Sequence, residues 1–187
     1  MDLRILKTKK SLYDALLHLM GERTFEEIKV SEICHKAMTN RSTFYAHFED
    51  KYALLNSLIL DLKEELKQEL EKNEAITNSK EYYMKCIHML LIHIEEHQDI
   101  YFPLIINNRN SVAMDMIYDT LLDDVKMRME IEEQRDWSIE LVSHFYLGAI
   151  LHVMMEWLEK GCSISKEDIM LYLDALIPNK IHVGGIA

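Results

Sequence analysis

The stretch that decides the fold is residues 28–55, which read IKVSEICHKAMTNRSTFYAHFEDKYALL. An apolar stripe at helical spacing comes first, the polar pair Thr39-Asn40 interrupts it, and two phenylalanines one helical turn apart follow. The positions expected to face inward are Val30, Ile33, Ala37, Phe44 and Phe48. The stretch therefore predicts two short helices that pack together and are joined by a tight turn.

The second short helix begins with small polar residues. Nearly all of its outward side chains donate hydrogen bonds, and they are Asn40, Arg41, Ser42, Thr43, Tyr45 and His47. A helix with such an N-terminus beside a tight joint has the form that enters the major groove of DNA. Arg41 can donate two bonds to guanine, and Asn40 can pair with adenine. The two helices therefore predict a helix-turn-helix module.

Residues 5–60 resemble the TetR family of transcription regulators. The resemblance is carried by Thr-Phe-Tyr at 43–45, His-Phe at 47–48, Lys51 and Leu-Leu at 54–55. It implies that Asn40, Arg41 and Ser42 read bases at the exposed start of the recognition helix. It also implies contacts with the phosphate backbone, which we expect from Thr43, Tyr45, His47 and Lys51.

Two residues depart from the pattern of that family. Lys29 stands where the family often has a helix-capping threonine, and Met38 stands where many members have a glycine in the turn. A lysine still reaches phosphate, so we expect Lys29 to contact the DNA backbone as well. A methionine does not adopt a left-handed conformation cheaply, so we expect a turn that is less tight than usual.

The rest of the chain predicts more helices and no strands. A first helix, ending near Gly21, is indicated by the apolar repeat Ile5, Leu12, Leu16 and Leu19. Only five Gly and two Pro occur in 187 residues, so we expect an all-α fold of about nine helices. The resemblance implies a three-helix DNA-binding domain at 1–55, joined by a connector helix to a helical ligand-sensing and dimerisation domain at 56–187.

Breakers and capping residues suggest where the later helices begin and end. Asp50 is expected to cap the connector helix, and Pro103 to lie near a helix start. Residues 107–110, NNRN, predict a turn. Gly161 is expected to stop a long helix, and Ser165 with Asp168 to open the last one.

Charge is distributed unevenly along the chain. Of 21 basic and 32 acidic side chains, eight of each lie in residues 1–50, which leaves 13 basic and 24 acidic in 51–187. The net charge of −11 therefore falls outside the predicted DNA-binding module. Within that module a phosphate backbone can approach a basic end formed by Arg4, Lys7, Lys9 and Lys10. The same cluster also suits a solubilising tail.

The sequence predicts a cytoplasmic protein. Three cysteines, at 34, 86 and 162, are odd in number and form no CxxC pair, which suits a reducing compartment. The N-terminus lacks the apolar stretch of a signal peptide, and eighteen apolar residues never run together. We therefore expect neither secretion nor a membrane partner.

The resemblance implies a homodimer. A physical reason agrees with it: one short recognition helix offers little contact area, so such proteins usually read two half-sites as a dimer. In the family the last two helices form a four-helix interface, which corresponds to residues 137–160 and 166–177 here. The expected contacts are Phe145, Gly148, Leu151, His152, Tyr172, Leu173 and Leu176. The alternative is that this stripe is core within one chain.

The middle helices are rich in methionines and aromatic residues. Such side chains line adaptable cavities, and the candidates are Tyr83, Met84, Met89, Tyr101, Phe102, Met116, Tyr118 and Trp137. Each of them taken singly also suits ordinary core packing. A pocket for a small-molecule effector is therefore implied by the family.

One motif favours a different chemistry. His93-Ile94-Glu95-Glu96-His97 fits the HxxEH pattern of inverted zinc peptidases. No third ligand or second glutamate accompanies it in the sequence, so we expect no metal, no cofactor and no enzymatic activity.

The leading hypothesis is a repressor that binds palindromic operator DNA as a homodimer and is released by a small-molecule ligand. The alternatives are an activator, or a DNA-binding scaffold controlled by a partner protein, with the zinc peptidase as a remote third. Repressors and activators can share one DNA reader, so the sequence leaves the sign of regulation open.

Overall fold

The structure is a computed structural model that describes residues 3–73, 79–131 and 138–177. Within these ranges the regular structure is entirely helical, which confirms the predicted all-α class of about nine helices. The elements are α1 (Leu3–Met20), the 3₁₀ turn η1 (Phe25–Glu27), α2 (Val30–Lys36), α3 (Arg41–Tyr45), α4 (Lys51–Asn73), α5 (Ser79–Glu96), α6 (Gln98–Asn108), α7 (Val112–Ile131), α8 (Ser138–Glu159) and α9 (Lys166–Leu176).

The chain forms two compact units. Unit 1 contains Met1–Glu64 and Gln98–Tyr118, and unit 2 contains Glu65–His97 and Asp119–Ala187. Helices α4 and α7 each begin in unit 1 and end in unit 2. Grouping by packing thus joins α6 to the N-terminal helices. The division at residue 55 is drawn by expected role, and it stays a prediction.

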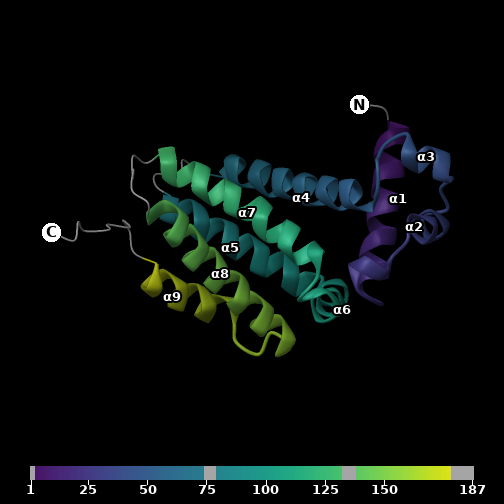
Figure 1. Cartoon of the computed structure of the whole chain (residues 1–187). Helices are drawn as coiled ribbons and strands as arrows, with labels where there is room; N and C mark the ends of the chain where they lie inside the picture. The colour runs from purple at the N-terminus through teal and green to yellow at the C-terminus, as the bar shows by residue number, and fades with distance from the viewer. Residues whose placement is uncertain (1–2, 74–78, 132–137, 178–187) are drawn as a thin grey trace. The chain divides into compact units, whose positions relative to one another are not determined.

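The helices α1, α2 and α3 pack together with η1, with α2 on α1 and α3 on α2 (Figure 1). We call this helical unit, residues 3–48, the reader. Its buried side chains include Leu12, Leu16, Leu19, Phe25, Ile28, Ile33, Cys34, Phe44 and Phe48. Three of the five positions predicted to face inward are therefore buried, while Val30 and Ala37 are half-buried. Ile5, which the apolar repeat placed on the first helix, is exposed.

The turn between α2 and α3 corrects one expectation. Met38 adopts a left-handed conformation with φ of 50°, the geometry for which glycine is preferred. The Thr39 N–H donates to the Cys34 carbonyl at 2.9 Å, and the Met38 N–H donates to the His35 carbonyl at 3.2 Å. These two bonds make a Schellman cap, so the turn is tight despite the missing glycine.

A buried amide joins α6 to the reader. Asn108 is fully buried, and its Oδ1 accepts the Phe25 N–H at 2.7 Å. Its Nδ2 donates to the Met20 carbonyl at 2.8 Å and to the Leu104 carbonyl at 2.9 Å. Every polar atom of this side chain is used, so α6, the end of α1 and the start of η1 are held as one body.

The same joint corrects the expectation for Pro103 and half of that for residues 107–110, because Asn107 and Asn108 end α6 while Arg109 and Asn110 form the predicted turn. Pro103 lies inside α6, which begins at Gln98 and continues to Asn108. A Cβ built on Gly21 would lie 3.6 Å from Cγ of Pro103, which is an ordinary contact distance, so α6 packs beside the end of α1. Gly21 follows α1 as predicted, but its φ is not in the left-handed region.

In unit 2, α8 and α9 both pack on α5 (Figure 1). Gly161 ends α8 in a left-handed conformation with φ of 65°, as predicted. The Ser165 Oγ accepts the Asp168 N–H at 3.1 Å, which confirms the predicted start of the last helix. The Trp157 indole N–H donates to the Ile164 carbonyl at 2.7 Å and so fixes the turn between α8 and α9.

Replacing Met38 by glycine should stabilise the protein, because a left-handed conformation costs an L-residue about 1 kcal/mol that glycine avoids. Denaturant unfolding at fixed protein concentration measures this. Lys36→Gly, inside α2, is the matched control and should destabilise. If both variants lose stability equally, the turn at Met38 carries no strain.

Asn108→Leu should lower the free energy of unfolding by about 2–4 kcal/mol, because the Phe25 N–H and the Met20 carbonyl would stay buried without partners. Asn110, which is exposed, supplies the control Asn110→Leu. Unfolding midpoints in urea compare the two. A loss at Asn108 no larger than at Asn110 would contradict the role of this amide.

Candidate nucleic-acid interface

The start of α3 forms an exposed polar edge on a buried anchor. Asn40 is the N-cap residue with an extended backbone (φ −71°, ψ 147°), and its carbonyl accepts the Phe44 N–H at 3.0 Å. Phe44 is fully buried, and its ring contacts Phe48 at a centroid distance of 5.8 Å. Asn40, Arg41 and Ser42 are all exposed. The three predicted base-reading residues thus lie together at one helix start.

Arg41 differs from two other cations of the reader. The Arg23 guanidinium donates to Glu32 at 2.8 Å, and the Lys36 ammonium lies 3.5 Å from Glu22. Arg41 forms no ion pair with any residue that the structure describes. Its planar fork of donors is therefore available for a ligand outside the chain.

Three of the side chains predicted to contact phosphate lie on or just after α3, and they differ in exposure. Tyr45 and His47 are exposed, and each ring rests on a buried phenylalanine: Tyr45 on Phe44 at 5.3 Å, and His47 on Phe48 at 6.4 Å. Thr43 is half-buried. These three residues continue the polar edge of α3, and their contact with phosphate stays a prediction.

Lys29 caps α2 through its backbone. The Lys29 N–H donates to Glu32 at 2.9 Å, and the same carboxylate accepts the Arg23 bond. The bond from Lys29 is the largest cause that holds the pKa of Glu32 below its ordinary value; partial desolvation opposes it and Arg23 reinforces it. Glu32 therefore supplies the half of a capping box that accepts the N-cap N–H, while the exposed Lys29 side chain has no acceptor for the first-turn N–H that a threonine would accept.

Lys51 has an environment that the sequence does not suggest. Its ammonium donates to the backbone carbonyls of Phe25, Glu26 and Ile28, at 2.8, 2.8 and 2.9 Å. The side chain is half-buried at the start of α4, and desolvation lowers the pKa of Lys51 despite the nearby Glu26 and Asp50. Its ammonium thus points at the chain itself.

The basic N-terminal end is also partly occupied. The Lys9 ammonium lies 2.9 Å from Asp61 of α4, and this hydrogen bond is the largest cause that raises the pKa of Lys9. The Tyr13 hydroxyl donates to the same carboxylate at 2.7 Å. Lys9 therefore fastens α1 to α4, while Lys7 and Lys10 remain exposed.

The predicted pocket residues are not gathered in one unit. Tyr83, Met84 and Met89 belong to unit 2, and Trp137 lies outside the described residues; the others belong to unit 1, namely Tyr101, Phe102, Met116 and Tyr118. Phe102 is exposed, and the Tyr83 hydroxyl donates to the Val125 carbonyl at 3.3 Å. A cavity lined by them stays a prediction.

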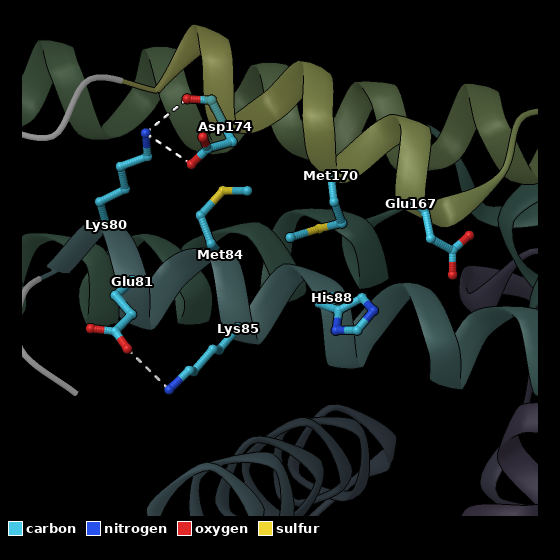
Figure 2. Close-up of a pocket in the computed structure, with 8 residues that line it drawn as sticks. All are labelled: Lys80, Glu81, Met84, Lys85, His88, Glu167, Met170 and Asp174. Atoms are coloured by element: carbon cyan, nitrogen blue, oxygen red, sulfur yellow. Dashed lines mark hydrogen bonds and ion pairs between the residues drawn. The ribbon is translucent and has the colours of Figure 1, made fainter. Parts of the chain in front are cut away.

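Unit 2 has a groove of about 590 Å³ between α5 and α9. Figure 2 shows Met84 and Met170 pointing toward each other across it, while Lys80 reaches Asp174 on the facing helix. Its lining residues are Lys80, Glu81, Met84, Lys85, His88, Glu167, Met170 and Asp174. Only Met84 is shared with the predicted pocket, because charged residues rather than aromatic ones line this groove.

The HxxEH motif lies at the end of α5. The rings of His93 and His97 are 4.7 Å apart between centroids, and burial lowers the pKa of His93 with a further contribution from His97. Among the described residues, no three His, Cys, Asp or Glu side chains gather as metal ligands. The structure thus places the two histidines together without a third ligand in that part of the chain.

A second candidate surface lies on α8 and α9. Phe145, Tyr172 and Leu176 are 67%, 65% and 73% exposed, and a Cβ on Gly148 would meet nothing within 4 Å. Residues 139–159 of α8 are long and apolar enough to cross a membrane by composition, yet only 28% of that window is buried. The helix thus presents an apolar face that its own unit leaves uncovered.

The other predicted interface residues differ in exposure. His152 is exposed, and Leu151 is half-buried. Leu173 requires a correction, because it is only 6% exposed and α9 packs on α5. Leu173 was expected in the interface together with Tyr172, but adjacent residues on a helix point about 100° apart, so Leu173 belongs to the core of unit 2.

Two family descriptions match the chain. Residues 12–58 match "Bacterial regulatory proteins, tetR family", and residues 81–179 match "Transcriptional regulator C-terminal region". The first range contains most of the reader with the start of α4, and the second runs from α5 through α9.

Individual proteins agree with this match. The dhaKLM operon transcriptional activator DhaS of Lactococcus lactis is 26% identical over 85% of this chain and 83% of its own length. A TetR transcriptional regulator of Streptococcus agalactiae is 26% identical, with a TM-score of 0.65 over 92% of this chain and 94% of its own. FadR of Bacillus subtilis, solved with stearoyl-CoA, is 16% identical with a TM-score of 0.66 over 92% and 99% of the two chains, and shows the fold alone. The chain belongs to the TetR family of DNA-binding transcription regulators.

Proposed function

We propose that the protein binds operator DNA as a homodimer and that an effector controls this binding. One observation carries the proposal: Asn40, Arg41 and Ser42 stand exposed at the start of α3, on the fully buried Phe44. Arg41 is held there without an acidic partner among the described residues. A free guanidinium on a rigid helix start suits bidentate contact with guanine.

The flanking residues supply contacts that do not depend on base sequence. Tyr45 and His47 stand exposed on the rings of Phe44 and Phe48, so a phosphate bound there would meet donors of fixed orientation. Lys29, exposed at the start of α2, adds a positive charge. We assign these residues, with Thr43, to positioning the reader on the duplex.

The partner subunit is proposed to cover the apolar face of α8 and α9. Phe145, Gly148 and His152 follow one another at helical spacing on α8, and Tyr172 and Leu176 do so on α9. An uncovered face of large apolar side chains is typical of a protein interface. Two copies of one helix pair make a self-complementary contact of the kind that twofold dimers use.

Control by an effector is proposed to run through helices that belong to both units. Helices α4 and α7 begin in unit 1 and end in unit 2, so a shift of either helix in unit 2 reaches the reader through continuous backbone. Asn108, just before α7, transmits such a shift to Phe25. FadR, which shares the fold, holds stearoyl-CoA; this supports an effector site in such a fold and does not identify the effector here.

The leading sign of regulation is repression, and activation is the second candidate because the Lactococcus relative is named an activator. Both signs use the same DNA reader. A reporter gene placed behind the operator distinguishes them: repression predicts higher expression when the protein is deleted, and activation predicts lower expression.

Arg41→Ala should weaken binding to the preferred operator by about 1–3 kcal/mol and relax the preference for one base pair, because a bidentate contact with guanine is lost. Affinity is measured by fluorescence anisotropy on the operator and on variants at each position. Lys36→Ala, which removes a nearby cation already beside Glu22, is the control. Uniform loss on every sequence would refute the base-reading role.

Phe145→Asp should produce monomers that remain folded, because the side chain is 67% exposed within one chain and would place a charge in the apolar interface. Sedimentation velocity reports the mass, and circular dichroism the helix content. Leu171→Asp is the matched control, since Leu171 is equally exposed and points about 100° away from Tyr172. Dimers that survive Phe145→Asp but dissociate with Leu171→Asp would place the interface elsewhere.

A further inference from the structure

We propose that Lys51 is a positioning residue, which fixes the reader to the first turn of α4 and makes no contact with phosphate in the operator complex. The proposal rests on the DNA binding proposed above and deepens it. It departs from the role that the family resemblance implies for this lysine. The reasons are the number of bonds that its ammonium already makes and the segment that receives them.

The donors of the Lys51 ammonium are fully used. An ammonium carries three N–H donors, and three carbonyl oxygens accept them at 2.8, 2.8 and 2.9 Å. A phosphate contact would require at least one of these bonds to break. The abandoned carbonyl would then lose a charge-assisted bond, so the exchange gains little.

Aromatic rings complete the site. The Lys51 Nζ lies 4.7 Å from the centroid of the Phe25 ring and 5.5 Å from that of Tyr52. The two rings meet edge to face at 5.2 Å, and Phe25 is fully buried. A cation over two ring faces is further stabilised where it stands. The ammonium is therefore held by carbonyls and rings together.

The accepting carbonyls belong to the segment that sets the direction of α2. Phe25 and Glu26 lie in η1, and Ile28 is its C-cap residue; Lys29, next in sequence, is the N-cap of α2. Because α3 packs on α2, whatever fixes η1 also fixes the recognition helix. Lys51 is the first residue of α4, so its three bonds to these carbonyls join the reader to the connector helix. We call this set of bonds the clamp.

Two substitutions distinguish the clamp from a phosphate contact. Arginine keeps the charge for a phosphate, but its planar guanidinium does not fit three converging carbonyls. We therefore expect Lys51→Arg and Lys51→Met to weaken binding to all DNA sequences alike, by about tenfold. The slope of log affinity against log salt should stay at its wild-type value, whereas loss of one phosphate contact lowers it by about 0.9.

A salt slope that falls by about one in Lys51→Met and is restored in Lys51→Arg would overturn the proposal. A measurement on the wild-type protein covers the case in which the variants fail to fold. The ¹⁵N signal of the Lys51 ammonium should not move when operator DNA is added, and a large shift would contradict the clamp. If the wild-type protein shows no salt-dependent binding to any DNA, the proposed function fails instead.

Discussion

The backbone of Phe25 is held from both sides by side chains that are distant in sequence. Its N–H donates to Asn108 of α6 at 2.7 Å, and its carbonyl accepts from Lys51 of α4 at 2.8 Å. Its ring is fully buried, with the Lys51 ammonium 4.7 Å from the ring centroid. Because Phe25 is fixed at its donor, its acceptor and its ring, we expect the reader to move together with the start of α4 and with α6.

Much of the fold follows from local periodicity. The spacing of Ile33, Phe44 and Phe48 predicts the helix-turn-helix core, and the polar run at 40–42 predicts an exposed helix start; both agree with the structure. These features depend on residues within a few turns of one another. The sequence predicts them because a helix repeats every 3.6 residues, and this period does not depend on residues elsewhere in the chain.

The sequence does not show contacts between residues that are far apart in the chain. In the sequence, Asn107 and Asn108 look like turn residues, because asparagine amides often bond to the backbone of a turn. In the structure, the Asn108 amide instead bonds to the backbone of Phe25, which lies 83 residues away in the chain. Lys51 and Lys9 look like phosphate ligands, because a cation in a DNA-binding module has two possible partners. Only the arrangement of α1, α4 and α6 shows that the chain itself supplies them.

The claim that the reader and α6 move as one body depends on the hydrogen bond from Phe25 to Asn108. Native-state hydrogen exchange of the Phe25 amide measures the free energy at which this bond opens. If the joint is as described, that amide exchanges only with the most protected amides of α1, at the free energy of unfolding of unit 1. Exchange of the Phe25 amide by a low-energy local opening, with α1 still protected, would show that the reader is not fastened to α6.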